Sequence, residues 1–301
     1  MHFITEEEVD RYLPMKDVIS VLEEAFEDLA NGKSSYSSRG RLKLSEGALV
    51  TMPSYFNKYN VAGLKTYVGS QKKYRHVLMF NSVSGEPIAL IESSRMGQIK
   101  TGALPAMVTK KMVHGGSHSL GILGSGLQAR GQLEGILAAF PLDSVNVYSR
   151  TPGNARKFAE EMSSKFGIDI KVHDTASSAL KNCSIISSAT SSLEPIFSRR
   201  DLGDTYHVNL IGANVPSRRE AAVDVLDQSD CVIVEDMPQA LEESAEIMGM
   251  KDRKKCIELV DLMKMNSNGL NERKRTVFKS MGVGLEDIAA GYALLKNMKI
   301  L

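Results

Sequence analysis

The segment SLGILGSGLQA, residues 119–129, decides the fold class of this chain. Its first half has the apolar pattern of a strand, and a helical pattern follows the glycines. Between them stands the GxGxxA form of the dinucleotide-binding fingerprint. Its first glycine permits a tight turn, its second lets the backbone approach a pyrophosphate, and its alanine keeps helix and strand close. The amino end of the helix also favours the negative charge of phosphates. We therefore predict a nucleotide-binding turn at Gly124, Ser125, Gly126, Leu127, Gln128 and Ala129.

The pattern that continues after this turn predicts a doubly wound parallel sheet. Strand-like and helical runs alternate, which is typical of α/β domains of the Rossmann type. The expected strands are 119–123, 144–148, 168–172, 184–188, 206–211 and 231–234, and the clearest helices are 128–140 and 155–166. Residues 276–279 are a further possible strand.

The chain before residue 115 has a different character. A helix is expected at 18–29, after Pro14, and short strands are expected at 41–44, 48–52, 61–68, 77–81 and 87–91. Strands that follow one another without intervening helices indicate an antiparallel or mixed sheet. A helical segment at 94–113 contains Pro105, which should kink it or end its first part. An amphipathic helix is expected at 285–298.

The end of the second Rossmann strand bears on the choice of cofactor. An NAD site usually has an acidic residue there to hold the ribose 2′-hydroxyl, but this chain has Ser149, Arg150 and Thr151. Hydroxyls and a guanidinium suit a 2′-phosphate. We therefore expect NADP(H) rather than NAD. The alternative is an arginine that is merely exposed beside a turn.

Composition excludes several classes of partner. The 301 residues carry 37 basic and 36 acidic side chains, so no strong field would attract nucleic acid or an acidic membrane. No apolar run approaches the roughly 18 residues of a membrane span. Cys183, Cys231 and Cys256 form no CxxC pair and fit free thiols in a reducing compartment, so a cytoplasmic protein is expected. His76 and His114 lack companions at metal-ligand spacing, and no metal site is expected.

Several separated segments together resemble, in order, the ornithine cyclodeaminase/mu-crystallin family. They are SSRGRLKLSEGALVTMPSYFNKYNVAGLKTYVG (37–69), GQIKTGA (97–103), GILGSGLQAR (121–130), IGANVPSRRE (211–220) and SMGVGLEDIAA (280–290), and the resemblance covers residues 1–301. It implies a Rossmann NAD(P)-binding domain, residues 116–280, inserted in a smaller α+β domain for substrate binding and dimerisation. The latter would comprise residues 1–115, with 281–301 returning to it. A homodimer that acts on a small 2-oxo, imino or amino acid is implied as well.

The resemblance also implies a clamp for the substrate carboxylate. Arg39 and Lys65 match its basic members, and Arg41 remains an alternative to Arg39. The third member is usually arginine, whereas this chain has Lys100, which keeps the charge but loses the planar fork. Reduction at C2 also needs a proton donor. A lysine whose pKa is lowered by neighbouring positive charge could serve, and Lys65 is our candidate. We further expect a cofactor site that includes Thr101, Ala189, Thr190, Gly212, Ala213, Asn214 and Gly282.

The end of the strand at residue 211 distinguishes the reactions of this family. Cyclodeaminases resembling this chain have an aspartate after a Gly-Gly pair, where this chain has Gly212-Ala213-Asn214. Asparagine can orient a carbonyl or imine but cannot act as an acid or base near neutral pH. We therefore predict an NAD(P)H-dependent oxidoreductase. Its substrate would be a 2-oxo acid with ammonia, as in alanine dehydrogenases, or a cyclic imino acid such as Δ1-pyrroline-2-carboxylate. The alternatives are an ornithine cyclodeaminase and a non-catalytic NADPH-binding protein like the crystallin.

Overall fold

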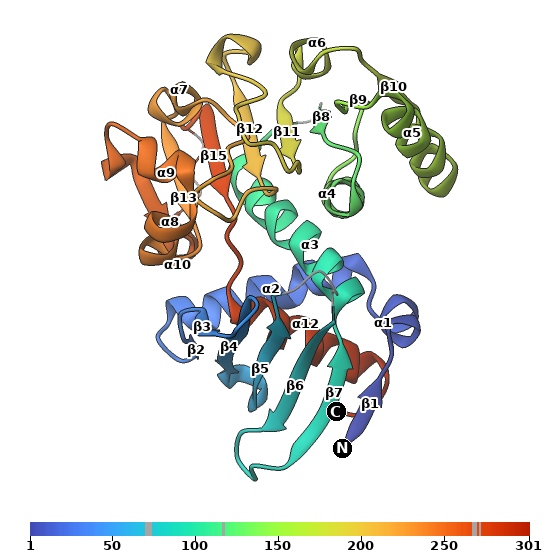
Figure 1. Cartoon of the computed structure of the whole chain (residues 1–301), viewed down its shortest axis with the longest axis vertical. Helices are drawn as coiled ribbons and strands as arrows, with labels where there is room; N and C mark the ends of the chain where they lie inside the picture. Colours follow the sequence, from blue (N-terminus) through green and yellow to red (C-terminus); the bar gives the residue numbers. More distant parts are fainter. Residues whose placement is uncertain (70–73, 116–117, 267–269, 271) are drawn as a thin grey trace. The chain divides into compact units, whose positions relative to one another are not determined.

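The computed structural model describes residues 1–69, 74–115, 118–266, 270 and 272–301. The chain divides into two compact units (Figure 1). The first comprises Met1–Leu104 and Gly282–Leu301, and the second comprises Pro105–Met281. The division falls within helix α3 (Ser94–Met112), which continues through Pro105 as one helix. The proline therefore does not end the first part of the helix.

The first unit is built on a mixed seven-stranded sheet, as the closely spaced strands predicted. Its order is β1-β7-β6-β5-β4-β2, with β3 also paired to β4. Only the pairing of β1 with β7 is parallel among the described strands of this sheet. The strands are β1 (His2–Ile4), β2 (Ser35–Tyr36), β3 (Gly40–Lys43), β4 (Ala48–Phe56), β5 (Val61–Val68), β6 (Arg75–Asn81) and β7 (Pro87–Glu92).

Two helices cover one face of this sheet. Helix α12 (Gly284–Asn297) packs against α2 (Met15–Ala30), β4 and β5, and Figure 1 shows both helices behind the strands. The short helix α1 (Glu6–Tyr12) begins with a capping box between Thr5 and Glu8. The prediction that the last helix is amphipathic was wrong, because α12 lies between α2 and the sheet and is buried on nearly all sides.

The alternation of side chains along β5 decides where Lys65 lies. Residues 61, 63 and 65 are buried, whereas the residues between them are half-buried. Lys65 is paired in register with Met52 of β4 and Val77 of β6, which are both buried. Side chains of one register row share a face of the sheet. Lys65 therefore lies on the face that the helices cover.

The second unit contains the predicted parallel sheet, and the Rossmann fold class is confirmed. Its eight strands have the order β10-β9-β8-β11-β12-β15-β13-β14, and all pairings are parallel. The order reverses between β8 and β11, and ligands of such sheets bind at this switch point. The strands are β8 (Ser119–Leu123), β9 (Ser144–Tyr148), β10 (Ile170–Val172), β11 (Ile185–Ser188), β12 (Tyr206–Leu210), β13 (Cys231–Val234), β14 (Cys256–Glu258) and β15 (Arg275–Lys279).

Most of these parallel strands are connected through α-helices, the usual crossover for parallel pairing, whereas β11 and β12 are connected through a 3-10 helix at Arg199–Asp201. The two that the sequence predicted are α4 (Leu127–Ala139) and α5 (Pro152–Phe166). Shorter ones escaped the pattern analysis because one or two turns give too little periodicity to recognise. These are α6 (Ala176–Leu180), α7 (Val223–Asp227), α8 (Met237–Glu243), α9 (Ala245–Gly249) and α10 (Leu259–Lys264).

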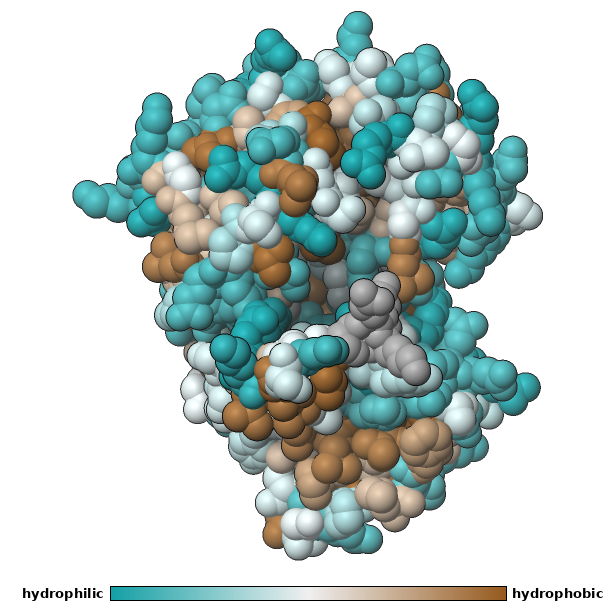
Figure 2. Space-filling model, viewed as in Figure 1, coloured by the Kyte–Doolittle hydropathy of each residue, from teal (hydrophilic) through white to brown (hydrophobic). Residues whose placement is uncertain are grey.

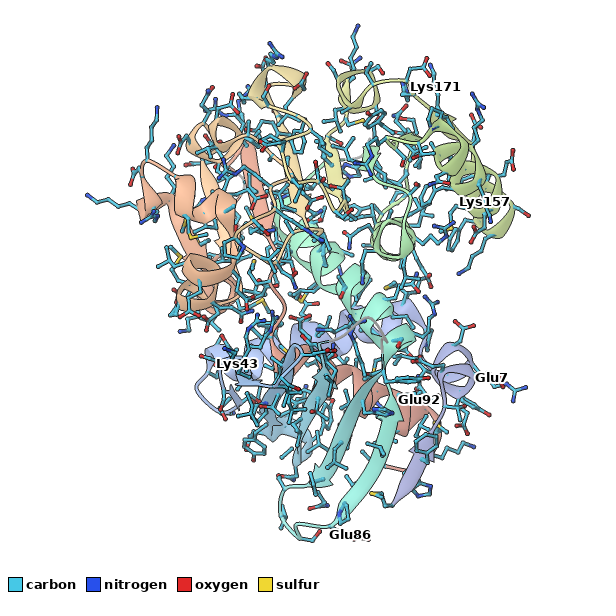
Figure 3. All side chains as sticks on the ribbon, viewed as in Figure 1. Glu7, Lys43, Glu86, Glu92, Lys157 and Lys171 are labelled. Atoms are coloured by element: carbon cyan, nitrogen blue, oxygen red, sulfur yellow. The ribbon has the colours of Figure 1, made fainter. Side chains whose placement is uncertain are left out.

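The surfaces of both units carry the ordinary charged groups of a globular protein. Lys43 of β3, Lys157 of α5 and Lys171 of β10 are exposed, and Figure 3 labels their positions on the two units. Among the described residues, none of the helices combines the length and the apolar character that crossing a bilayer requires.

Candidate functional site

In the second unit, the predicted nucleotide turn follows β8 directly. Gly124 has φ +106°, a backbone conformation that favours glycine, and its N–H donates to the carbonyl oxygen of Tyr148 at 2.8 Å. A methyl group there would lie 2.5 Å from the carbonyl oxygen of Ala189. Because Ala189 follows β11, the loops after β8 and β11 touch at the switch point. Only glycine fits this contact.

The next glycine leaves room for a ligand. Gly126 is exposed and is the N-cap of α4, so the helix begins without a capping side chain. Apart from its chain neighbours, no heavy atom of the described residues lies within 4 Å of a methyl group placed there. Ala129 is fully buried, as the fingerprint requires. An open helix amino end with free space around its glycine fits the pyrophosphate of a dinucleotide.

The residues expected to choose the cofactor lie after β9. The Ser125 hydroxyl donates to the Ser149 hydroxyl at 2.9 Å, which joins the glycine turn to the end of β9. Arg150 and Thr151 are exposed. A guanidinium at this place is available to a 2′-phosphate, and the assignment to NADP stays a prediction.

The loops after β11 and β12 contain the other expected cofactor residues of this unit. They are Ala189 and Thr190 after β11, and Gly212, Ala213 and Asn214 after β12. Asn214 is exposed and outside regular structure. A single buried carboxylate, Glu220, holds both loops, because it accepts hydrogen bonds from the N–H of Thr190 at 2.7 Å and of Gly212 at 2.6 Å.

In the first unit, Lys65 and Lys100 meet two carboxylates at the start of α12. Lys65 Nζ lies 2.8 Å from Asp287 Oδ1, and Lys100 Nζ lies 3.0 Å from Asp287 Oδ2. Lys100 Nζ also lies 3.0 Å from Glu286 Oε2. All four side chains are buried. Two positive and two negative charges therefore cancel within the group, and Asp287 bridges both ammonium groups.

The two lysines differ in how readily they lose a proton. Burial is the largest cause that lowers the pKa of Lys65, Asp287 opposes the shift and Lys100 adds to it, and together these effects place the pKa at about 8. Burial also acts on Lys100, but Asp287 and Glu286 outweigh it and raise the pKa of Lys100 above its ordinary value. The expected effect of neighbouring positive charge on Lys65 is present, although burial is the larger cause. Lys65 is the lysine suited to proton transfer.

The remaining candidates for the carboxylate clamp, Arg39 and Arg41, differ in how far they are buried. Arg39 is half-buried and donates to the carbonyl oxygen of Gly282 at 3.1 Å. A methyl group at Gly282 would lie 3.8 Å from Lys100 Nζ, so Arg39 reaches the surroundings of the lysine–carboxylate group. Arg41 is exposed on β3. Thr101 is half-buried next to Lys100 on α3, so Thr101 and Gly282 belong to the first unit.

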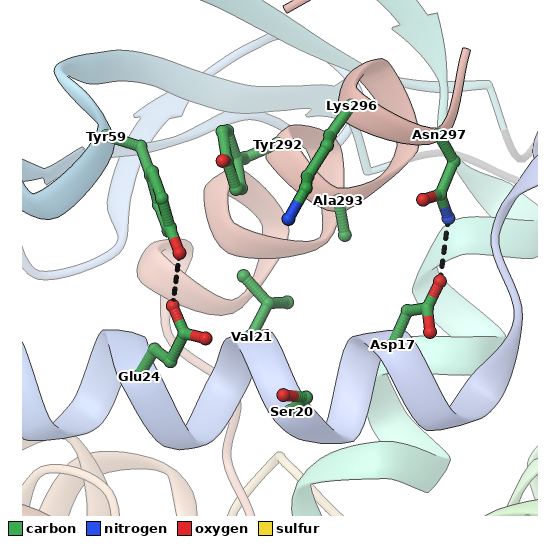
Figure 4. Close-up of a pocket in the computed structure, with 9 residues that line it drawn as sticks. All are labelled: Asp17, Ser20, Val21, Glu24, Tyr59, Tyr292, Ala293, Lys296 and Asn297. Carbon is green, nitrogen blue, oxygen red and sulfur yellow. Dashed lines mark hydrogen bonds between the residues drawn. The ribbon is translucent and has the colours of Figure 1, made fainter. Parts of the chain in front are cut away.

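A separate pocket of about 190 Å³ lies between α2 and α12 (Figure 4). The rings of Tyr59 and Tyr292 stack in its wall with centroids 3.8 Å apart, and the Tyr59 hydroxyl donates to Glu24 at 2.5 Å. At the other end, Asn297 donates to Asp17 at 2.8 Å. The residues that the sequence singled out do not line this pocket.

Sequence reasoning missed several charged residues that hold the lysine–carboxylate group of the first unit and the expected cofactor loops of the second. Glu286 and Asp287 stand within the quoted segment at 280–290, whereas for Glu220, in the segment at 211–220, the sequence indicates only support for its own loop. Such residues could have been found in the sequence as charged residues within a segment of otherwise apolar or small residues, such as the adjacent acids in LEDIAA. Lys279, at the end of β15, is of the same kind and is fully buried.

Comparison with known proteins identifies the family. Residues 1–299 match the model of the ornithine cyclodeaminase/mu-crystallin family. The chain belongs to this family. The predicted membership is thereby confirmed, and its relatives include reductases and dehydrogenases, the enzyme class that the sequence predicted.

Three relatives show how far the similarity extends. A Δ1-pyrroline-2-carboxylate reductase of Bacillus thuringiensis subsp. konkukian is 30% identical over 96% of this chain and 94% of its own length. An alanine dehydrogenase of Archaeoglobus fulgidus is 26% identical over 98% of this chain and 94% of its own. The structure of Thermococcus litoralis Δ1-pyrroline-2-carboxylate reductase in complex with NADH and L-proline superposes with a TM-score of 0.88 and 28% identity. It covers 99% of this chain and 98% of the other.

Proposed function

We propose that this family member is an NAD(P)H-dependent reductase of small imino acids, with Δ1-pyrroline-2-carboxylate as the representative substrate. The observation that carries the proposal is Lys65, a buried lysine whose ammonium group Asp287 holds at 2.8 Å and whose pKa is lowered to about 8, as suits a proton donor. The 30% identical bacterial relative bears the name of this reductase. The reaction of alanine dehydrogenases reduces an open-chain imine from a 2-oxo acid and ammonia, and it is the second candidate because the Archaeoglobus relative is so named.

The residues of the first unit would bind and orient the substrate. The Arg39 guanidinium, which is held by the Gly282 carbonyl group, would bind the carboxylate. The Lys65 ammonium group, which is held by Asp287, would donate its proton toward the imine nitrogen. Lys100 is engaged with two carboxylates, so we assign it to holding Asp287 rather than to gripping substrate.

The residues of the second unit would hold the dinucleotide, whose nicotinamide supplies the hydride when it is bound. Gly124 and Gly126 would receive the pyrophosphate, and the loops that contain Thr190 and Gly212 would line the strand ends beside it. Asn214 would orient the reacting group without exchanging a proton. This choice separates a reductase from a cyclodeaminase, which would need an acid or base at that place.

We further propose a preference for NADPH, which rests on Arg150. If Arg150 binds the 2′-phosphate, Arg150→Ala should weaken NADPH binding about tenfold to a hundredfold, the range for a lost hydrogen bond to a charged group. NADH binding should stay unchanged. Dissociation constants measured by nucleotide fluorescence test this, with the exposed Lys157→Ala as a matched control for a lost positive charge. Equal effects on the two nucleotides would contradict the assignment.

A homodimer is also proposed, through the open face of the first unit's sheet. Pro53, Leu64, Leu78 and Leu90 form one register row across β4, β5, β6 and β7, on the face opposite Lys65. The three leucines are half-buried rather than buried. Figure 2 shows hydrophobic side chains, in brown, gathered over the strands of this sheet. A continuous apolar row on a sheet face is typical of an interface, and a second copy of this chain is its natural partner.

A substrate screen tests the proposed function. Purified protein is mixed with NADPH or NADH and one of Δ1-pyrroline-2-carboxylate, pyruvate with ammonia, or ornithine, and oxidation of the nucleotide and release of ammonia are followed. The proposal expects nucleotide oxidation with the cyclic imine. Ammonia release from ornithine at a comparable rate, without net consumption of nucleotide, would replace the proposal with a cyclodeaminase. Nucleotide binding without turnover on any of these substrates would replace it with the binding protein.

A further inference from the structure

The carboxyl ends of three neighbouring strands lie side by side in the second unit. In the sheet, β12 lies between β11 and β15, with Leu210 paired to Ser188 on one side and to Lys279 on the other. The loops after β11 and β12 contain Thr190 and Gly212, which we expect in the cofactor site. The charged residues that hold these loops have no role in the function proposed above.

Glu220 uses both of its carboxylate oxygens to connect the two loops. Oε1 accepts hydrogen bonds from the Thr190 N–H at 2.7 Å, the Thr190 hydroxyl at 3.0 Å and the Ser188 hydroxyl at 2.7 Å. Oε2 accepts from the Gly212 N–H at 2.6 Å. Glu220 has no exposed surface. Hydrogen bonds from backbone N–H groups to a carboxylate are stronger than those to neutral acceptors, so this side chain fixes the spacing of the loops.

Lys279 holds the same loop from the other side. Its Nζ donates to the carbonyl oxygen of Ala213 and lies 3.9 Å from Glu246 Oε2. Glu246 in turn accepts from the backbone N–H of Glu220 at 2.9 Å. Lys279 and Glu246 are also without exposed surface. The residues Glu220, Lys279 and Glu246, which we call the buried triad, thus clamp residues 212 and 213 between β11 and β15.

The loops have little freedom to shift around the triad. A methyl group at Gly212 would overlap the backbone of Thr190 and come within 2.8 Å of Glu220 Oε1. Burying ionised groups carries a desolvation penalty that apolar side chains of similar volume would avoid. The triad occurs at the strand ends where such sheets bind ligands. The triad therefore lies at the edge of the sheet where we expect the dinucleotide to bind.

We propose that Glu220 and Lys279 are positioning residues that set the loops after β11 and β12 in the geometry that binds the dinucleotide. The proposal rests on the proposed function, since it takes these loops as part of the cofactor site. Neither residue is assigned contact with cofactor or substrate. Their effect passes through Thr190, Gly212 and Ala213.

Glu220→Gln is the most selective test. Glutamine has nearly the same volume, but its amide nitrogen cannot accept a hydrogen bond. Whichever way the amide turns, either the Gly212 N–H or the donors of Ser188 and Thr190 lose their acceptor. Losing the acceptor at one loop and the negative charge at both should raise the dissociation constant of NADPH about tenfold or more. In steady-state kinetics, the KM for the nucleotide should rise by a larger factor than the KM for the imine. A purely structural role would change the melting temperature without this split.

Asp230→Asn is the matched control, because Asp230 accepts two backbone N–H bonds at 2.9 Å, from Lys274 and Arg275. Those bonds lie at the amino end of β15, the edge opposite the cofactor loops. This variant should lower the melting temperature while NADPH binds as in the wild type.

The outcomes separate the two proposals. If the wild type binds NADPH and Glu220→Gln binds it equally well, the positioning role is wrong. If the wild type binds neither nucleotide, the proposed function fails instead. Should Glu220→Gln not fold, Glu246→Gln is measured in its place, because it weakens the bond to the Glu220 backbone and leaves both loop bonds in place. It should raise the dissociation constant by a smaller factor, and a wild-type value there would overturn the positioning role.

Discussion

At the scale of single residues, the proposed chemistry depends on Lys65. The resemblance to the family led to Lys65, together with the expectation that neighbouring positive charge lowers its pKa. Lys100 does contribute to that shift, but burial contributes more, and Asp287 opposes it. The burial and the aspartate come from the packing of α12 on β5, which no local pattern around residue 65 contains. Sequence reasoning could therefore find the lysine but not the groups that adjust it.

A pH profile tests this role of Lys65. With a pKa of about 8, Lys65 is protonated below that pH and neutral above it. A proton donor works in its protonated form, so kcat for imine reduction should fall as the pH rises through about 8. Lys65→Met should remove the pH step and reduce kcat by about a hundredfold or more, the usual contribution of acid–base catalysis, while NADPH binding persists. The exposed Lys43→Met serves as control. A kcat that is constant or rises across this range would exclude Lys65 as the acid.

At the scale of elements, the glycine turn and the buried triad show which parts of the cofactor site the sequence can predict and which it cannot. The turn between β8 and α4 is local, because adjacent residues determine its geometry and Gly124 has the left-handed φ that the fingerprint demands. The loops after β11 and β12 are set by residues more distant in the sequence, because Glu220 lies 30 residues after Thr190 and Lys279 lies 66 residues after Ala213. The last helix was misjudged for a related reason. Its exposed face was expected from periodicity, but α2 covers it.

Lys100 of α3 connects this helix with α12 through ion pairs with Glu286 and Asp287. Lys100→Met would leave Glu286 and Asp287 buried with Lys65 as their only cation within the described group, and breaking such a buried ion pair costs about 3–5 kcal/mol. Chemical denaturation should show a loss of this size in the free energy of unfolding. Lys296→Met, at the exposed carboxyl end of α12, should change it little. A Lys100 variant as stable as the control would contradict the account of this ion-pair group.

At the scale of the whole molecule, the sequence predicted the fold class because two kinds of pattern alternate along the chain. Closely spaced strands gave the mixed sheet of the first unit, and regular strand–helix alternation gave the parallel sheet of the second. The short elements β1, β2 and β14 were missed because two or three residues carry no period. The row of Leu64, Leu78 and Leu90 was also out of reach, because it depends on the register of three strands.

The proposed dimer predicts that a charge in this row separates the subunits. Leu78→Lys places a charge at the centre of the apolar face, where association would bury it without a partner, so the protein should become monomeric. Light scattering after size-exclusion chromatography measures the mass directly. Val83→Lys is the matched control, because Val83 is 79% exposed outside the strands of the sheet, and it should leave the mass unchanged. A Leu78 variant that is still dimeric would place the interface elsewhere.

The central claim is that this chain transfers a hydride from a reduced nicotinamide nucleotide to C2 of a small imino acid. The most direct measurement supplies NADPH carrying deuterium at C4 of the nicotinamide, on the face that is transferred, together with Δ1-pyrroline-2-carboxylate. The products are then analysed by mass spectrometry, and labelling on each face is tried in turn. The account predicts proline with one deuterium at C2 for every nucleotide oxidised, from one of the two labelled forms. Unlabelled proline from both forms, or no proline while ornithine releases ammonia, would contradict it.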